Sequence, residues 1–417
     1  MGVLSLLSVL SVLFPTALAP AADGPTACGW RGDGTGLYPS ATPPTEWDID
    51  EGKNILWKAE VGKGQSTPVV VRIAGNPPGD RVLVTAEHEW LLCVDRASGK
   101  VLWKADNGYA ALPAGSNAPD KRPPASPNCG YSTPTPVTDG KLVYASYGTG
   151  IVACFGLDGH RQWIRYLDVP QATQYGRAAS PLLAAGRLIV SLGGLMALDA
   201  KSGRTLWHQP EAKPTYGTPA LARIGDADVA ITPNGDCVRL ADGKILAKEL
   251  AESKYISPLV QGGVVYFGDT TAAARKLPAK AGETLELPIL WEADLEGEFF
   301  ASPLLHEGIL YCVSNGGTLS ALDARTGKPV FQQELEIPNA SGRPGTEAAN
   351  IYPSLALVGK HLLVGNDIGV TLVLAPGKEY KQISRNFLDK GSGASPVADG
   401  KQLFLRGGTR LYCIGTK

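Results

Sequence analysis

One phrase returns along this chain. The stretch "ALDAKSGRTLW" at 197–207 reappears as "CVDRASGKVLW" at 93–103 and as "ALDARTGKPVF" at 321–331. In each copy an Asp and a Gly, which tolerate the backbone angles of a bend, predict a tight turn between two short strands. Two shorter copies place Asp158-Gly159 and Asp242-Gly243 between apolar runs, as is typical of β-hairpins. A hairpin that recurs at long spacing predicts an array or a ring of similar units.

A second phrase precedes each hairpin: a Ser or Thr, then Pro, then small or branched apolar residues, as in "ASPLLAAG" at 179–186. Its prolines are Pro68, Pro136, Pro181, Pro219, Pro258, Pro303, Pro353 and Pro396. Further strand-like runs and Gly-rich turns lie between the two phrases. The eight starts therefore predict an all-β fold, an eight-bladed β-propeller with four-stranded antiparallel blades.

The last unit lacks its outer strand, because the chain ends at "RLYCIGTK". The stretch "NILWKAEVG" at 54–62 has the pattern of such a strand and precedes the first unit. We predict that this N-terminal strand completes the C-terminal blade and closes the ring, which removes an open sheet edge. The chain then divides into a leader at 1–22, a lead-in segment at 23–53 and a single propeller domain at 54–417.

The leader has the composition of an export signal. Residues 1–22 are apolar and end in "ALAPAA", whose small residues predict cleavage near Ala19 or Ala22. No later apolar stretch is long enough to span a bilayer. We therefore expect a periplasmic or secreted protein of the cell envelope, without a transmembrane segment. The net charge of −1 provides no positive surface that would attract a nucleic acid, so we expect no nucleic-acid partner. We also expect a monomer.

Together the two phrases resemble the repeat of the pyrroloquinoline-quinone (PQQ) dehydrogenases and their non-enzymatic relatives. Those relatives include BamB, the propeller subunit of the bacterial outer-membrane β-barrel assembly machinery. The resemblance covers about residues 54–417. It implies that a tryptophan ends each fourth strand and packs against the next blade. The matching structural residues here are Trp57, Trp103, Trp163, Trp207 and Trp291.

The resemblance does not extend to a cofactor site. The dehydrogenases hold PQQ with a disulfide between two adjacent cysteines and with Glu, Asn and Asp around a calcium ion. No two cysteines are adjacent in this chain, so we expect neither PQQ nor calcium. The histidines show no metal-ligand spacing, and no catalytic, cofactor-binding or metal-binding residue is assigned. Cys93, Cys237 and Cys413 stand where other units have Ala, which predicts small core residues on separate blades.

The residues just before each Ser-Pro start form the one candidate site. At these positions the chain enters the innermost strands, around one mouth of the central channel. The candidate partner-binding rim consists of Tyr131, Arg177, Tyr216, Tyr255, Phe300, Asn350 and Tyr352. Aromatic rings with polar edges suit a sugar, a peptide strand or a side chain of a partner. The alternative is that these rings only fill the funnel of a wide ring.

These observations favour an exported, non-catalytic β-propeller that binds or scaffolds a protein or carbohydrate partner in the bacterial envelope. Two enzymatic alternatives remain. One is a PQQ-dependent dehydrogenase, which the missing adjacent cysteines disfavour. The other is an enzyme that acts on polysaccharides from the funnel, which a pair of carboxylates at glycosidase spacing would support.

Overall fold

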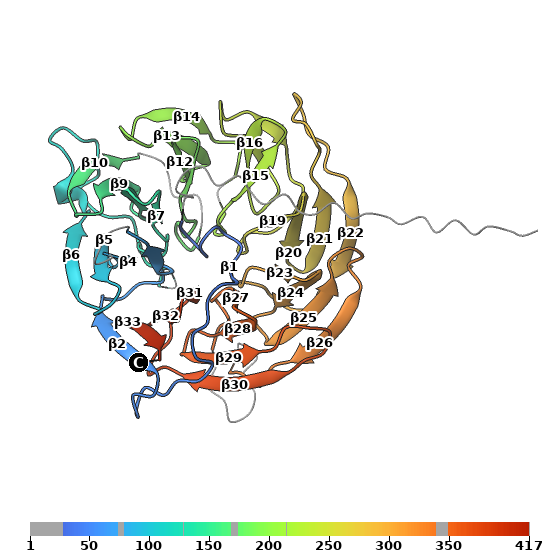
Figure 1. Ribbon diagram of the computed structural model, residues 1–417. Coiled ribbons are helices and arrows are strands. Elements are labelled where there is room, and N and C mark those ends of the chain that lie inside the picture. Colours follow the sequence, from blue (N-terminus) through green and yellow to red (C-terminus); the bar gives the residue numbers. More distant parts are fainter. Residues whose placement is uncertain are drawn as a thin grey trace, which may run out of the picture.

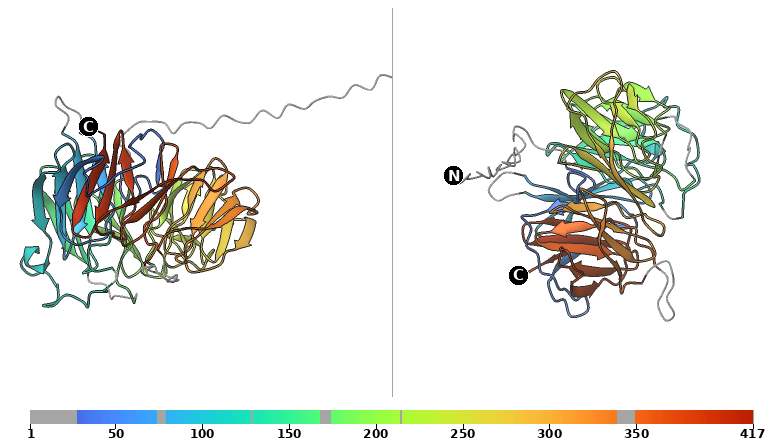
Figure 2. Two further views of the ribbon diagram at one scale, coloured as in Figure 1. Left: turned by 90° about the horizontal axis from the view of Figure 1, so that it is seen from below. Right: turned by 90° about the vertical axis from the view of Figure 1, so that its right-hand side faces the viewer.

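The computed structural model describes residues 28–73, 79–127, 129–167, 174–213, 215–338 and 349–416. The described strands form eight sheets around a central axis, seen as a single ring in Figure 1 and from two sides in Figure 2. This confirms the all-β, eight-bladed propeller. The leader predicted at 1–22 lies outside the described residues. The described part contains no helix long and apolar enough to cross a membrane.

Each blade runs outward from the axis in chain order. Blade one contains β3 (Val69–Val71), β4 (Arg81–Ala86), β5 (Trp90–Asp95) and β6 (Val101–Asp106). Blade two contains β7 (Val137–Thr138), β8 (Leu142–Ser146), β9 (Ile151–Gly156) and β10 (Arg161–Tyr166). Blade three contains β11 (Leu182–Ala184), β12 (Arg187–Ser191), β13 (Leu195–Asp199) and β14 (Thr205–Gln209). Blade four contains β15 (Ala220–Ile224), β16 (Ala227–Ile231), β17 (Cys237–Arg239) and β18 (Ile245–Ala247).

The second half of the ring follows the same plan. Blade five contains β19 (Leu259–Gln261), β20 (Val264–Gly268), β21 (Thr271–Lys276) and β22 (Ile289–Asp294). Blade six contains β23 (Leu304–His306), β24 (Ile309–Val313), β25 (Thr318–Asp323) and β26 (Pro329–Glu334). Blade seven contains β27 (Ala356–Val358), β28 (His361–Gly365), β29 (Val370–Leu374) and β30 (Gln382–Phe387). Blade eight contains β31 (Val397–Asp399), β32 (Gln402–Gly407) and β33 (Arg410–Gly415), and a short 3₁₀ helix, η1 (Tyr109–Ala111), follows blade one.

The position of a strand in its blade explains its sequence pattern. The middle strands β24 and β29 are buried along their whole length, because each blade lies between two others. Both faces of such a strand are covered, so its apolar residues run without interruption. The outer strand β6 instead alternates between half-buried and exposed residues. The core is therefore a series of apolar layers between neighbouring blades.

The N-terminal strand closes the ring. Strand β2 (Ile55–Glu60) pairs antiparallel with β33, and Trp57 lies opposite Cys413. It supplies the missing outer strand of blade eight, which confirms the predicted closure (Figure 1). The two ends of the propeller domain thus share one sheet, and the outer edge of blade eight is completed.

The lead-in segment adds a strand that the repeat does not predict. Strand β1 (Leu37–Tyr38) pairs in parallel with β27, so the sheet of blade seven has five strands. Inner strand β27 faces the central channel, and β1 covers its free edge there (Figure 1). Blade seven keeps the four antiparallel strands of the repeat, and β1 is an additional strand from outside the repeat. The physical reason for this addition is that a segment crossing the channel can satisfy an inner edge from within.

The repeat tryptophans join neighbouring blades. Trp291 of blade five donates its indole N–H to the Ala324 carbonyl of blade six over 2.8 Å. Its ring lies on Gly327, where a Cβ atom would come within 2.5 Å of the indole. Gly327 has a φ of 71°, so it provides both the bend of the turn and the space for the ring. Equivalent indole bonds to the next blade are made by Trp57, Trp103, Trp163 and Trp207.

Candidate functional site

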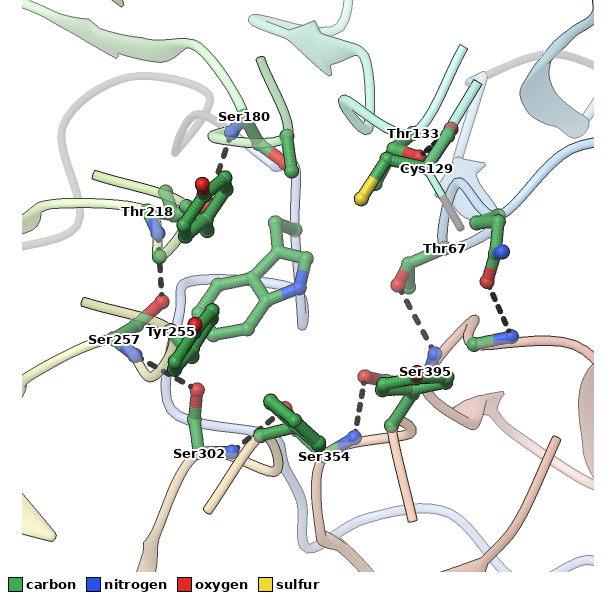
Figure 3. Close-up of a pocket in the computed structure, with 18 of the residues that line it drawn as sticks. Thr67, Cys129, Thr133, Ser180, Thr218, Tyr255, Ser257, Ser302, Ser354 and Ser395 are labelled. Atoms are coloured by element: carbon green, nitrogen blue, oxygen red, sulfur yellow. Dashed lines mark hydrogen bonds between the residues drawn. The ribbon is translucent and has the colours of Figure 1, made fainter. Parts of the chain in front are cut away.

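A closed ring of hydrogen bonds surrounds the central channel. In each blade one Ser or Thr beside the axis donates its backbone N–H to the hydroxyl of the equivalent residue in the next blade. Figure 3 shows the part of this ring that runs from Ser180 through Ser302 to Thr67. The N···O distances are 2.8 to 3.2 Å, and the last bond, from Ser395 to Thr67, closes the circle. We call these residues the hydroxyl ring: Thr67, Thr135, Ser180, Thr218, Ser257, Ser302, Ser354 and Ser395. All are buried, so each N–H needs the partner that the next blade supplies.

The hydroxyl ring explains why Ser or Thr precedes Pro in the repeat. The hydroxyl residue must donate a backbone N–H, which proline cannot do, whereas the next residue carries no such requirement. In blade seven the order is reversed, because Pro353 precedes Ser354 and Leu355 follows it. Ser354 nevertheless makes both bonds of the ring. Leu355 therefore holds the place that proline has in the other units, and the predicted start at Pro353 is two residues out of register.

A cavity of about 350 Å³ opens at the hydroxyl ring, and we call it the cup. Trp30 lines both the cup and a smaller cavity, so it lies between the two, and we call it the floor of the cup. Arg31 holds the floor in place by donating from Nη2 to the carbonyls of Leu355, at 2.8 Å, and Pro303, at 3.1 Å. Its guanidinium carbon lies 5.2 Å from the centre of the Trp30 ring. Burial lowers the pKa of Arg31 to about 10.

One wall of the cup is aromatic. Tyr216, Tyr255, Phe300 and Tyr352 each stand two residues before a member of the hydroxyl ring, in blades four to seven. Successive ring centres are 5.1 Å apart along this row. Tyr216 stacks on Tyr255 at 8°, and Phe300 meets Tyr255 edge-on at 84°. Such contacts favour one arrangement of the rings. We call these four residues the aromatic arc.

The opposite wall is small and polar. The equivalent positions in blades eight, one, two and three hold Gly393, Gln65, Thr133 and Ala178, and all of them line the cup. The Gln65 amide oxygen accepts the backbone N–H of Gly393 over 2.8 Å, which links two blades across this wall. Cys129 also faces the cup (Figure 3), and burial raises the pKa of its thiol to about 11. The cup is therefore lopsided, with the aromatic arc on one side and small or polar residues on the other.

The structure brings together five residues of the candidate rim. Tyr216, Tyr255, Phe300 and Tyr352 form the aromatic arc, and Asn350 lies beside it in the lining. The Asn350 side chain is held by two hydrogen bonds: its Nδ2 donates to Asp367 at 3.1 Å, and its Oδ1 accepts from Asn315 at 3.2 Å. These five residues converge on one mouth of the channel.

Tyr131 and Arg177 do not line the cup. The Tyr131 hydroxyl donates to the Pro123 carbonyl over 2.5 Å, and the Arg177 Nη1 donates to the Gly148 carbonyl over 3.1 Å. Both side chains are buried, and burial lowers the pKa of Arg177. They stand four and three residues before their hydroxyl-ring members, whereas the residues of the aromatic arc stand two residues before theirs. In these two blades the residues that stand two positions before the hydroxyl residue are Thr133 and Ala178, and both line the cup.

Sequence reasoning missed three further parts of the site. The hydroxyl ring could have been found, because the Ser or Thr of the repeated phrase recurs in every unit. Glu298 and Tyr175 precede members of the ring by four and five residues and also line the cup. Trp30 lies outside the repeat, so no repeated pattern indicates its place on the floor.

Comparison with known proteins identifies the family. The family model described as "Outer membrane protein assembly factor BamB" matches residues 47–286 and 257–414, which is most of the chain. The chain belongs to the BamB family. Among curated members, it is 23% identical over 306 residues to the assembly factor of Moranella endobia (strain PCIT), covering 69% of this chain and 72% of that one. It is 26% identical over 184 residues to the factor of Escherichia coli (strain K12), covering 41% and 45% of the two chains.

Solved structures share the BamB-family fold. The structure of BamB from Moraxella catarrhalis is similar with a TM-score of 0.60 and 12% identity, over 87% of this chain and 99% of that one. A quinohemoprotein alcohol dehydrogenase from Comamonas testosteroni is similar with a TM-score of 0.56 and 11% identity, over 90% and 78% of the two chains. At these identities the likeness concerns the fold alone.

The cup of this BamB-family propeller does not fit PQQ. PQQ is a polycarboxylate, and an anion taken out of water needs basic side chains or a metal ion beside it. Within its described lining, the cup offers no Lys, Arg or His and carries the carboxylate of Glu298. Nor do three His, Cys, Asp or Glu side chains converge as metal ligands anywhere in the described ranges. The same lining lacks the carboxylate pair that a glycosidase uses.

Proposed function

We propose that this chain is an exported, non-catalytic scaffold protein of the bacterial envelope, and that the cup binds a group projecting from a protein partner. Family membership supports the scaffold role, because curated relatives are named as outer membrane protein assembly factors. The composition of residues 1–22 supports export. A protein partner is favoured over a carbohydrate because the relatives are named for the assembly of a protein.

The aromatic arc is the observation that carries this proposal. A funnel that needed only filling would bury its rings, yet Tyr216, Tyr255, Phe300 and Tyr352 are each only partly buried beside an open cavity. Partly exposed rings fixed by one another form a preorganised apolar surface, and the polar groups of Asn350 and Glu298 lie next to it. Aromatic anchors in a pocket are the usual centres of binding energy at protein interfaces.

Affinity capture from the native envelope fraction tests the proposal. The wild-type chain is compared with Tyr216→Ala, with Tyr255→Ala and with Phe387→Ala, which removes an exposed ring of outer strand β30. We expect each arc variant to retain about a fifth or less of the captured partner, since one ring contact is worth about 1 kcal/mol or more. The Phe387 variant should capture as the wild type does.

The melting temperature separates binding from packing. We expect the two arc variants to melt within about 2 °C of the wild type, because removing a partly exposed ring leaves no closed cavity. A large loss of stability with unchanged capture would show that the rings pack the funnel and are not a site. Capture of a polysaccharide in place of a protein would support the carbohydrate alternative.

A further inference from the structure

The charge of the cup indicates what kind of group it accepts. Its described lining contains the aromatic arc, the Trp30 floor, neutral hydroxyl and amide groups, and one charged side chain, the carboxylate of Glu298. Arg177, the basic residue predicted at this rim, does not line the cup and instead lies near Tyr109 and Tyr166, which interact with it electrostatically. The cup therefore presents a negative charge and several π-systems with no positive charge among them.

Two more carboxylates act on the same rings. Asp367 accepts the backbone N–H of Asn350 over 2.8 Å, which fixes this carboxylate beside the mouth. The pKa of Tyr352 is raised mainly by burial, and the negative charges of Asp367 and Glu298 raise it further. Burial is also the largest cause of the raised pKa of Tyr255, to which Glu298 and Asp269 contribute. The carboxylates of Glu298, Asp269 and Asp367 thus lie near enough to the aromatic arc to act on its tyrosines.

Aromatic faces and carboxylates attract the same class of ligand. A cation near a ring is attracted by the negative charge over its face, and this attraction grows when water is excluded. An anion in the same place would be repelled by Glu298 and would find no basic partner. The volume of about 350 Å³ is near the lower end for ligand pockets, which suits one side chain or one small molecule.

We propose that the cup binds an organic cation, an alkylammonium or guanidinium group, which sits beside the aromatic arc and pairs with Glu298. The inference rests on the proposed function and deepens it, because a lysine or arginine side chain of a protein partner would carry such a group. A free amine would carry the same chemistry. In either case charge and aromatic contact, rather than apolar area alone, select the ligand.

A pair of probes of nearly equal shape tests the role of charge. Choline and 3,3-dimethyl-1-butanol differ in having a quaternary nitrogen or a quaternary carbon. We expect calorimetric titration of the full chain to give a Kd for choline at least about tenfold lower than for the alcohol. The preference should shrink as salt is added. Equal binding of the two probes, or binding of neither when an acidic or a neutral sugar binds, would overturn the proposal.

Matched variants locate the interaction. Glu298→Gln removes the carboxylate, and its control Glu283→Gln removes an exposed carboxylate that pairs with Lys244 away from the cup. Phe300→Leu removes a ring of the arc, and its control Phe387→Leu removes an exposed ring of β30. We expect each cup variant to weaken choline binding about threefold to tenfold and each control to leave it unchanged. Cup variants that bind choline like the wild type would contradict the assignment.

Two further probes distinguish the sources of the cation. Tighter binding of N-acetyl-lysine methylamide or its arginine counterpart than of choline assigns the cup to a protein side chain. The reverse order assigns it to a free amine. Capture of an envelope partner without any preference for cations would refute this inference and leave the proposed function standing. Cation binding without capture of an envelope protein would support this inference and contradict the proposed function.

Discussion

Buried thiols give this protein a dependence on alkaline pH. Cys93, Cys154, Cys237, Cys312 and Cys413 are free and buried in the blades. Burial raises the pKa of each from 9.0 to about 12, because the thiolate would lose its hydration. Between these values the unfolded chain has released protons that the folded chain keeps. The stability that these thiols provide is therefore complete below pH 9 and is lost progressively as the pH rises toward 12.

Urea unfolding at several pH values tests this dependence. We expect the free energy of unfolding to fall between about pH 9 and 11, and to fall less steeply in Cys312→Ala than in the wild type. Val313→Ala, at the buried neighbouring position of β24, is the control, since it removes volume without removing a titrating group. Its curve should lie below that of the wild type with the same slope. Equal slopes for Cys312→Ala and the wild type would contradict the prediction.

The outer strands of the blades are joined by an indole and a glycine. The Trp291 ring of β22 is buried against Gly327 and donates its N–H into blade six. This contact combines a large buried area with a hydrogen bond, and both are lost when the side chain is truncated. Gly327 is equally necessary for this contact, because any side chain at this position would occupy the space of the indole.

Substitutions on β22 measure the strength of this contact. We expect Trp291→Ala to lower the free energy of unfolding by about 3–5 kcal/mol, because a ring-sized cavity remains between the blades. Trp291→Phe keeps most of the apolar area and should cost less. The control Leu290→Ala, which is 47% exposed on the same strand, should have a small effect in the same urea titration. A loss for Trp291→Ala no larger than for Leu290→Ala would show that the indole does not hold the blades together.

The whole molecule is a ring closed at two radii. At the outer radius, β2 completes blade eight by pairing with β33. At the inner radius, the backbone N–H of Ser395 donates to the Thr67 hydroxyl and completes the hydroxyl ring. Both contacts join segments from opposite ends of the propeller domain. The outer contact lies within the sheet of blade eight, and the inner contact joins blade eight to blade one.

Deleting 54–62 tests the outer closure. We expect a clear fall in the melting temperature and a tendency to aggregate, because the edge of β33 is left unpaired. Deletion of 113–121, an equally long and largely exposed stretch, is the control and should change the melting temperature little. A 54–62 deletion that melts like the wild type and stays monomeric in light scattering would contradict the closure.

The repeat by itself determined the architecture. Alternating and continuous apolar runs, Asp-Gly turns and the incomplete last unit are local signals, and local backbone preferences produce local strands and turns wherever they occur. Eight blades, closure by 54–62 and the arc residues Tyr216, Tyr255, Phe300 and Tyr352 were therefore predictable from the sequence. The arc residues were predictable because each stands shortly before the start of a repeat unit, where the chain enters an innermost strand.

Only the tertiary structure decided what closes the cup and which rim residues face it. Trp30 reaches the floor because Arg31 binds the Leu355 carbonyl, a contact between residues 324 positions apart. Such a contact has no counterpart in other units, so no periodicity reveals it. Tyr131 and Arg177 lie near the rim in sequence, but the offset from the hydroxyl does not decide which side chains face the cup. Tyr131 and Glu298 both stand four residues before a member of the hydroxyl ring, and only Glu298 lines the cup. The burial of Tyr131 and Arg177 depends on Pro123 and Gly148, which the fold, not the repeat, brings to them.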